Sequence, residues 1–313
     1  MISMGIQEFN RFFKTKTLAS TYKPMLAKCL LDLGDYNEDE GGHWVEENEE
    51  SLTVDLNFVV ARFLRYYHPL KFKFKLKQDP QPYKTILIYE ILEGFKDEID
   101  VKSTPSKKKV CSDSFSNIRQ KTISSDAIKG QVLPKLLNDC NIYEIIDNSK
   151  RIVIKKDIVE YMKNNHSVLE SALNNMIAVY LEGCNASPNI STKLRETIPR
   201  DRLKTTDFEK IIQLQDNKCF FCNQQFDRYA QEHFLPWNFI FKTENFNITA
   251  ACKTCNSSKN DRLPDAKYLE KILERNDKLS DLPSGYSEEF FRRLYETCKI
   301  EYHGKDTELW SLN

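Results

Sequence analysis

Four cysteines, arranged as two C-x-x-C pairs, constrain the fold of this 313-residue chain more than any other feature. Cys219 and Cys222 flank two phenylalanines, Cys252 and Cys255 flank Lys-Thr, and 29 residues separate the pairs. Each C-x-x-C turn directs two sulfurs to one side, so two turns complete a tetrahedron of thiolates around Zn²⁺. Two disulfides are the alternative, which a reducing compartment disfavours. The spacing therefore predicts a zinc site, and because four thiolates fill the zinc shell, we expect the metal to be structural.

The stretch QEHFLPWNFI, residues 231–240, lies between the cysteine pairs and contains Glu232 and His233. Because four thiolates complete the zinc shell, His233 is not needed as a ligand there. Neighbouring side chains of a regular strand point to opposite faces, which argues against one reaction centre using both residues. The residues by themselves leave His233 open as a packed structural histidine or as a catalytic base.

The residues that follow His233 resemble a known family. EHFLPW and then NITAACKTCNSSKNDRLP resemble the HNH endonucleases, the ββα-metal nucleases, whose segments read like Asp-His-x-x-Pro and Asn-Leu-x-x-x-Cys-x-x-Cys-Asn-x-x-Lys. The resemblance covers roughly residues 218–264, about one sixth of the chain. It implies a zinc-stapled module of two strands and a helix.

The resemblance also implies roles for individual residues. His233 matches the general base that removes a proton from the attacking water, a task that suits imidazole. Glu232 and Asn256 match the ligands of a catalytic divalent cation, Mg²⁺ or Mn²⁺, although aspartate is commoner than glutamate at the first position. Asn247 matches the asparagine that braces the loop between the strands. Lys259, three residues after Asn256, lies on a neighbouring helix face and is expected to contact a phosphate.

The function that follows from the resemblance is a metal-dependent HNH DNA endonuclease. A further loose resemblance of TYKPMLAKCLLDLGD to regions ahead of HNH modules favours bacterial restriction or phage defence. Three alternatives stay open: a non-catalytic zinc module that binds nucleic acid or protein, an effector-activated nuclease acting on RNA or DNA, and a homing endonuclease. Since one module carries one active site, a double-strand cut favours a homodimer or a partner protein from the same operon.

The predicted fold class is α+β, in four regions along the chain. A mainly helical N-terminal region (1–125) precedes a wing-like helix–hairpin–helix region (126–198). The zinc-stapled nuclease module follows (199–266), and C-terminal helices end the chain (267–313). The second region is expected to be a plain scaffold, with DNA binding as the alternative.

Local patterns predict individual elements of the N-terminal region. Apolar residues at helical spacing predict helices over 20–35 and 56–70. The acidic stretch 35–50 is expected to be an exposed loop. KFKFKLK, residues 71–77, alternates lysine with apolar residues and predicts a half-buried strand, with a basic surface as the alternative. The Ser-, Lys- and Thr-rich stretch 101–125 predicts a linker whose lysines are placed to meet phosphates.

Overall composition restricts the partners and the cellular location of the protein rather than its chemistry. The net charge is zero, so a nucleic-acid partner must be recognised by a local surface. No stretch approaches the ~20 apolar residues of a membrane helix, and no apolar leader is present, so we expect a cytoplasmic protein without membrane contact. The remaining cysteines are expected to be buried as small apolar residues: Cys29, Cys111, Cys140, Cys184 and Cys298.

Overall fold

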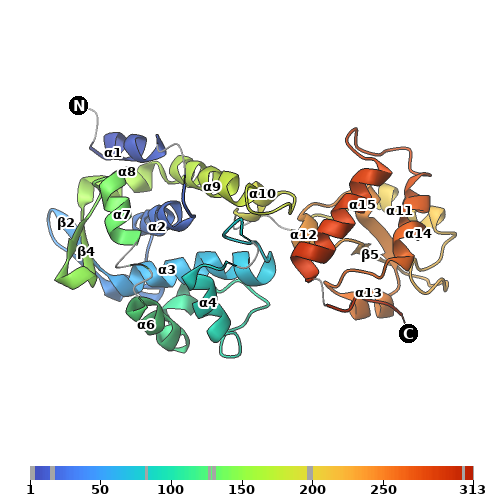
Figure 1. Ribbon diagram of the computed structural model, residues 1–313, viewed down its shortest axis with the longest axis horizontal. Helices are drawn as coiled ribbons and strands as arrows, with labels where there is room; N and C mark the ends of the chain where they lie inside the picture. The colour runs from blue at the N-terminus through green and yellow to red at the C-terminus, as the bar shows by residue number, and fades with distance from the viewer. Residues whose placement is uncertain are drawn as a thin grey trace. The chain divides into compact units, whose positions relative to one another are not determined.

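The computed structural model describes residues 4–14, 18–81, 84–125, 128, 132–195, 200–304 and 307–312. The chain divides into two compact units, Met1–Asn185 and Ala186–Asn313. Both combine helices with small antiparallel sheets, which confirms the predicted α+β class (Figure 1). Among the described residues, no helix combines the length and the apolar character needed to span a bilayer.

The first unit is built around the two helices predicted from apolar spacing. Helix α2 (Tyr22–Leu31) is buried along most of its length and packs against α3 (Leu56–His68) and α9 (His166–Glu182). The carboxylate of Asp55 caps α3 by accepting from the backbone N–H of Asn57. The other helices of this unit are α1 (Met4–Phe13), α4 (Leu87–Gly94), α5 (Lys107–Cys111), α6 (Ser116–Ser124), α7 (Val132–Asp139) and α8 (Lys156–Asn164).

The sheet of the first unit has the strand order β1-β2-β4-β3, and all neighbouring pairs are antiparallel. The predicted hairpin forms between β3 (Glu144–Ile146) and β4 (Arg151–Lys155). The strands β1 (Val45–Glu47) and β2 (Ser51–Asp55) were not predicted, and β2 lies beside β4 (Figure 1). The end of the acidic stretch 35–50 is therefore an edge strand rather than a loop.

The prediction of a strand at 71–77 is wrong. The backbone continues from α3 into a π-helical turn, Pro69–Lys73, and Lys75 then adopts a positive φ of 52°. Phe74 and Leu76 are buried, so the alternation of apolar residues correctly indicated which side chains face inward. The segment pairs with no described strand, and local alternation cannot supply that partner.

The prediction of a linker at 101–125 is also wrong. Two helices, α5 and α6, occupy most of this stretch, and Val110, Phe115 and Ile118 are buried in the core. Lys107 forms an ion pair with the buried carboxylate of Asp32 at 2.9 Å. Few apolar residues are needed to dock such short helices, which is why a polar composition concealed them.

The second unit contains a two-stranded sheet followed by a helix. Strands β5 (Ala230–His233) and β6 (Ile248–Ala251) pair antiparallel, with His233 opposite Ile248, and α13 (Lys253–Lys259) begins two residues after β6. Apolar side chains of α14 (Lys267–Asn276) and α15 (Glu288–Thr297) complete the core beside the cysteines. The other helices are α10 (Ile190–Lys193), α11 (Thr205–Leu214), which packs on β6, and α12 (Trp237–Ile240).

Candidate functional site

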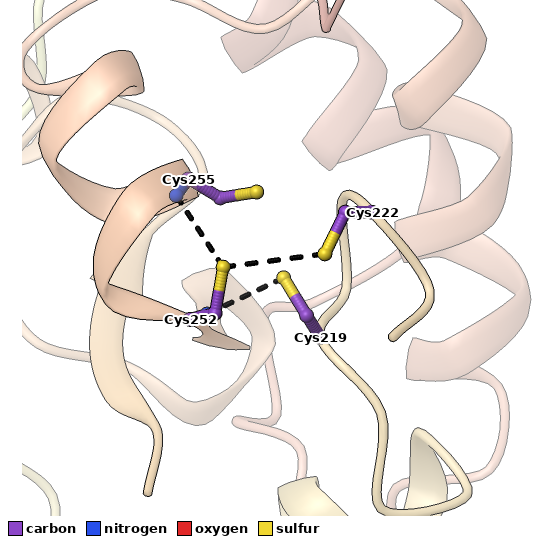
Figure 2. Close-up of side chains that lie close together, drawn as sticks. All are labelled: Cys219, Cys222, Cys252 and Cys255. Atoms are coloured by element: carbon purple, nitrogen blue, oxygen red, sulfur yellow. Dashed lines mark hydrogen bonds between the residues drawn. The ribbon is translucent and has the colours of Figure 1, made fainter. Parts of the chain in front are cut away.

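The four paired cysteines converge in the second unit. The sulfurs of Cys219, Cys222, Cys252 and Cys255 lie within 4.8 Å of one another and face a common centre (Figure 2). Tetrahedral zinc–thiolate bonds of about 2.3 Å place sulfurs about 3.8 Å apart. The 4.0 Å between the sulfurs of Cys222 and Cys252 is close to that spacing. The cluster can therefore bind a structural metal such as zinc.

The backbone around the cysteines is arranged to support thiolates. Cys252 is the N-cap of α13, and its sulfur accepts from the backbone N–H of Cys255 at 3.4 Å. The N–H of Cys252 donates in turn to the sulfur of Cys219 at 3.3 Å. Lys271 brings an ammonium group near the first turn by donating to the carbonyl of Phe220. These donors favour negative charge on sulfur, which metal binding requires.

A second polar site lies beside the cluster, in a cavity of about 770 Å³. Glu232 and His233 from β5 line this cavity together with Asn256 from α13. Glu232 and His233 are both buried, although they are neighbours on one strand. Both residues nevertheless line the same cavity, at the end of β5, although different side chains contact each of them. The other lining residues include Arg200, Arg202, Trp237, Asn238, Ser257, Asn260 and Asp261.

Three side chains surround the imidazole of His233. Arg200 donates from a guanidinium nitrogen to Nδ1 at 2.7 Å, while Nε2 lies 3.2 Å from the hydroxyl oxygen of Thr243. The ring of Trp237 packs edge-on at a centroid distance of 5.1 Å. Burial and the nearby charges of Arg200 and Lys259 lower the pKa of His233 to about 3. The imidazole is therefore neutral at physiological pH and is a weak base; an anion that offsets the two charges would raise its pKa but would leave the effect of burial, the largest cause.

Glu232 forms a buried ion pair with Lys259. The ammonium nitrogen of Lys259 lies 2.7 Å from Oε1 of Glu232 and also donates to the backbone carbonyl of His233 at 2.7 Å. Burial raises the pKa of Glu232, and the charges of Lys259 and Arg200 oppose that rise. Lys259 is fully buried, so it ties α13 to β5 instead of presenting its charge for the phosphate contact expected from the sequence.

Asn247 holds the chain where it leaves β5. Its side-chain oxygen accepts from the N–H of Leu235 at 2.8 Å, and its amide donates to the carbonyl of Leu235 at 3.1 Å. Its backbone carbonyl also accepts from the N–H of Phe234 at 2.8 Å. Asn247 is fully buried and does not line the cavity. It therefore fixes the backbone after His233, as a brace would.

Arg200, Thr243 and Asp261 belong to the site but were not identified from the sequence. Arg200 and Thr243 contact His233 from 33 and 10 residues away. Asp261 accepts from the side-chain amide of Asn238 at 3.1 Å and from the hydroxyl of Tyr302. Arg200 and Thr243 lie outside the stretches that carry the resemblance, and Asp261 lies inside one of them, two residues after the helix that carries Asn256 and Lys259.

No protein-family model, curated protein or solved structure matches this chain. The geometry of the cysteine cluster and of the cavity is therefore what supports a function.

Replacing Lys259 with methionine is expected to lower the free energy of unfolding of the second unit by about 3–5 kcal/mol, because it leaves Glu232 buried without its partner. Guanidinium chloride unfolding of the full chain measures the loss. Lys253→Met is the matched control, since Lys253 is exposed on the same helix and should change stability by less than about 0.5 kcal/mol. Adding Glu232→Gln to Lys259→Met should recover part of the loss. If Lys259→Met is as stable as Lys253→Met, the buried ion pair does not stabilise the second unit.

Proposed function

We propose that Ala186–Asn313 carries a metal-dependent HNH-type endonuclease site that hydrolyses phosphodiester bonds of DNA. The observation that supports this most is one cavity lined by a carboxylate, an imidazole and an amide, from Glu232, His233 and Asn256. These side chains come from a strand–strand–helix unit, and Asn247 braces its loop. A fully buried histidine with only structural contacts would not need to line a polar cavity.

The donor set of the cavity suits a hard divalent cation. Carboxylate and amide oxygens are ligands that Mg²⁺ and Mn²⁺ prefer, and Glu232 and Asn256 provide them. Lys259 donates to Oε1 of Glu232, and Glu232 would hold the cation together with Asn256. When bound, the cation would neutralise charge on the scissile phosphate and on the leaving oxygen.

The role of His233 follows from its hydrogen bonds. Arginine has only N–H donors, so Nδ1 must be the acceptor and Nε2 must carry the proton, which it donates to Thr243. Nδ1 is thus the nitrogen that takes a proton from water. The resulting hydroxide forms a new bond to phosphorus, the bond to the 3′ oxygen breaks, and that oxygen takes a proton from solvent. The products are a 5′-phosphate and a 3′-hydroxyl.

Supercoiled plasmid should be nicked in Mg²⁺ or Mn²⁺ and left intact when neither is added to the zinc-replete protein. Asn256→Ala should raise the concentration of cation needed for half-maximal cleavage by at least about tenfold, because a ligand is lost. Ser257→Ala is the matched control, since Ser257 lines the same cavity from the same helix and is not an expected ligand. DNA binding without cleavage in any divalent cation would instead support a non-catalytic zinc module.

A further inference from the structure

Arg200 contacts the ring nitrogen of His233 that the proposed mechanism assigns as the base. Its guanidinium donates to Nδ1 of His233 at 2.7 Å and lies 5.6 Å from the ring centroid of Trp237. The proposed base nitrogen is therefore covered in the free protein. Arg200 itself is exposed, so the guanidinium can leave this position by a side-chain rotation.

The segment that carries Arg200 is fixed to the strand that carries His233. The side chain of Gln231 on β5 accepts from the N–H of Leu203 at 2.9 Å and donates to its carbonyl at 3.1 Å. On the other side of the imidazole, the hydroxyl of Thr243 donates to the carbonyl of Asp201 at 2.9 Å. Residues 200–203 thus contact the histidine at both ring nitrogens, directly through Arg200 and through Thr243.

The chemistry of arginine favours an exchange of partners when a phosphate enters. Its hydrogen bond to Nδ1 joins a cation to a neutral acceptor. A phosphate oxygen is anionic, and a guanidinium can bind phosphate with two parallel hydrogen bonds, which are stronger and more directional. Arg200 and His233 line the same cavity, so a phosphodiester bound there meets the guanidinium next to the base.

We propose that Arg200 is a positioning residue that covers Nδ1 of His233 in the free protein and moves to a phosphate oxygen of bound DNA, which opens Nδ1 to water. This inference rests on the proposed endonuclease function. The contact between Arg200 and a phosphate would couple DNA binding to the exposure of the His233 base. The base is blocked until a phosphate is present. The face of Trp237 supports the guanidinium beside the histidine.

The first test observes the histidine without any cleavage. The full chain, labelled with ¹⁵N-histidine, is titrated with a short DNA duplex in zinc-replete buffer without Mg²⁺ or Mn²⁺. Binding should shift the Nδ1 resonance of His233, assigned from a His233→Gln variant, and Arg200→Gln should show an altered resonance before DNA is added. A wild-type resonance that stays unchanged while fluorescence anisotropy reports bound DNA would overturn the proposal.

The second test measures how accessible Nδ1 is to a reagent. Diethyl pyrocarbonate should modify His233 about tenfold faster in Arg200→Gln than in the wild type, the factor expected for loss of one charge-assisted hydrogen bond. Arg202→Gln is the matched control, since Arg202 is an exposed arginine of the same segment and cavity, and it should react like the wild type. Equal rates in all three proteins would overturn the proposal.

The two tests separate this inference from the endonuclease assignment. If the wild type cuts DNA, but the resonance and the reactivity of His233 are the same in the wild type and in Arg200→Gln, the positioning role fails and the nuclease assignment stands. If no cation supports cutting but DNA still shifts His233 through Arg200, the coupled contact stands and the nuclease assignment fails. Arg200→Gln also removes the contact with the phosphate, so it should weaken DNA binding, and Arg200→Lys should restore part of that binding because it returns the charge without the two-pronged geometry.

Discussion

Replacing His233 with alanine is expected to lower the rate of DNA cleavage by about 10²–10⁴-fold, the usual loss when a general base is removed. The reason is that Nδ1 is the acceptor nitrogen of His233, and no other histidine among the described residues lines the cavity. Single-turnover nicking of supercoiled plasmid in Mg²⁺ and in Mn²⁺ measures the effect. Because the change affects a proton transfer, DNA affinity should stay close to that of the wild type.

Two controls make the His233 result specific. His43→Ala removes an exposed histidine of the first unit and should leave the rate unchanged. Zinc content and the unfolding midpoint of His233→Ala should show that the second unit is still folded. If a folded His233→Ala protein cuts DNA at the wild-type rate, His233 is a structural histidine after all.

The cysteine cluster was predictable because its geometry is nearly local. Each C-x-x-C turn sets the direction of two sulfurs, so only one long-range approach, between Cys219–Cys222 and Cys252–Cys255, remained to be made. Helices α2 and α3 were predictable for a related reason. The spacing of apolar residues within one segment indicates which face of a helix is buried. In both cases a short stretch of sequence carries the signal, either the spacing of two cysteines or the period of the apolar residues.

The details of the cavity could not be predicted because they depend on contacts between separate segments. The sequence places Lys259 three residues after Asn256, on a neighbouring face of the helix. It does not show that the ammonium group points inward and pairs with Glu232. Arg200 reaches His233 from outside any motif. The predictions for 71–77 and 101–125 fail for a related reason: the first segment continues α3 as a π-helical turn, and α5 and α6 pack against α3, which the local pattern does not show.

Removing zinc is expected to have the largest effect on stability. Zinc binding contributes about 10–16 kcal/mol of apparent free energy in small zinc domains at neutral pH. Cys219, Cys252 and Cys255 are buried within the main apolar core of the second unit, so loss of the metal leaves unpaired thiols or thiolates among aromatic side chains. Cys252→Ser, or a strong chelator, should therefore abolish the cooperative unfolding of Ala186–Asn313.

Hydrogen–deuterium exchange of the full chain measures this loss unit by unit. Amides of β5, β6 and α13 should lose protection in Cys252→Ser, whereas amides of α2 and α3 should keep it, because their core contains none of the four cysteines. Cys298→Ala is the matched control: Cys298 is fully buried in the same core but outside the cluster, and its loss should cost about 1–3 kcal/mol and retain the metal. Protection of β5 and β6 that survives complete removal of zinc would show that packing alone folds this unit, and the four sulfurs would then need another explanation for their convergence.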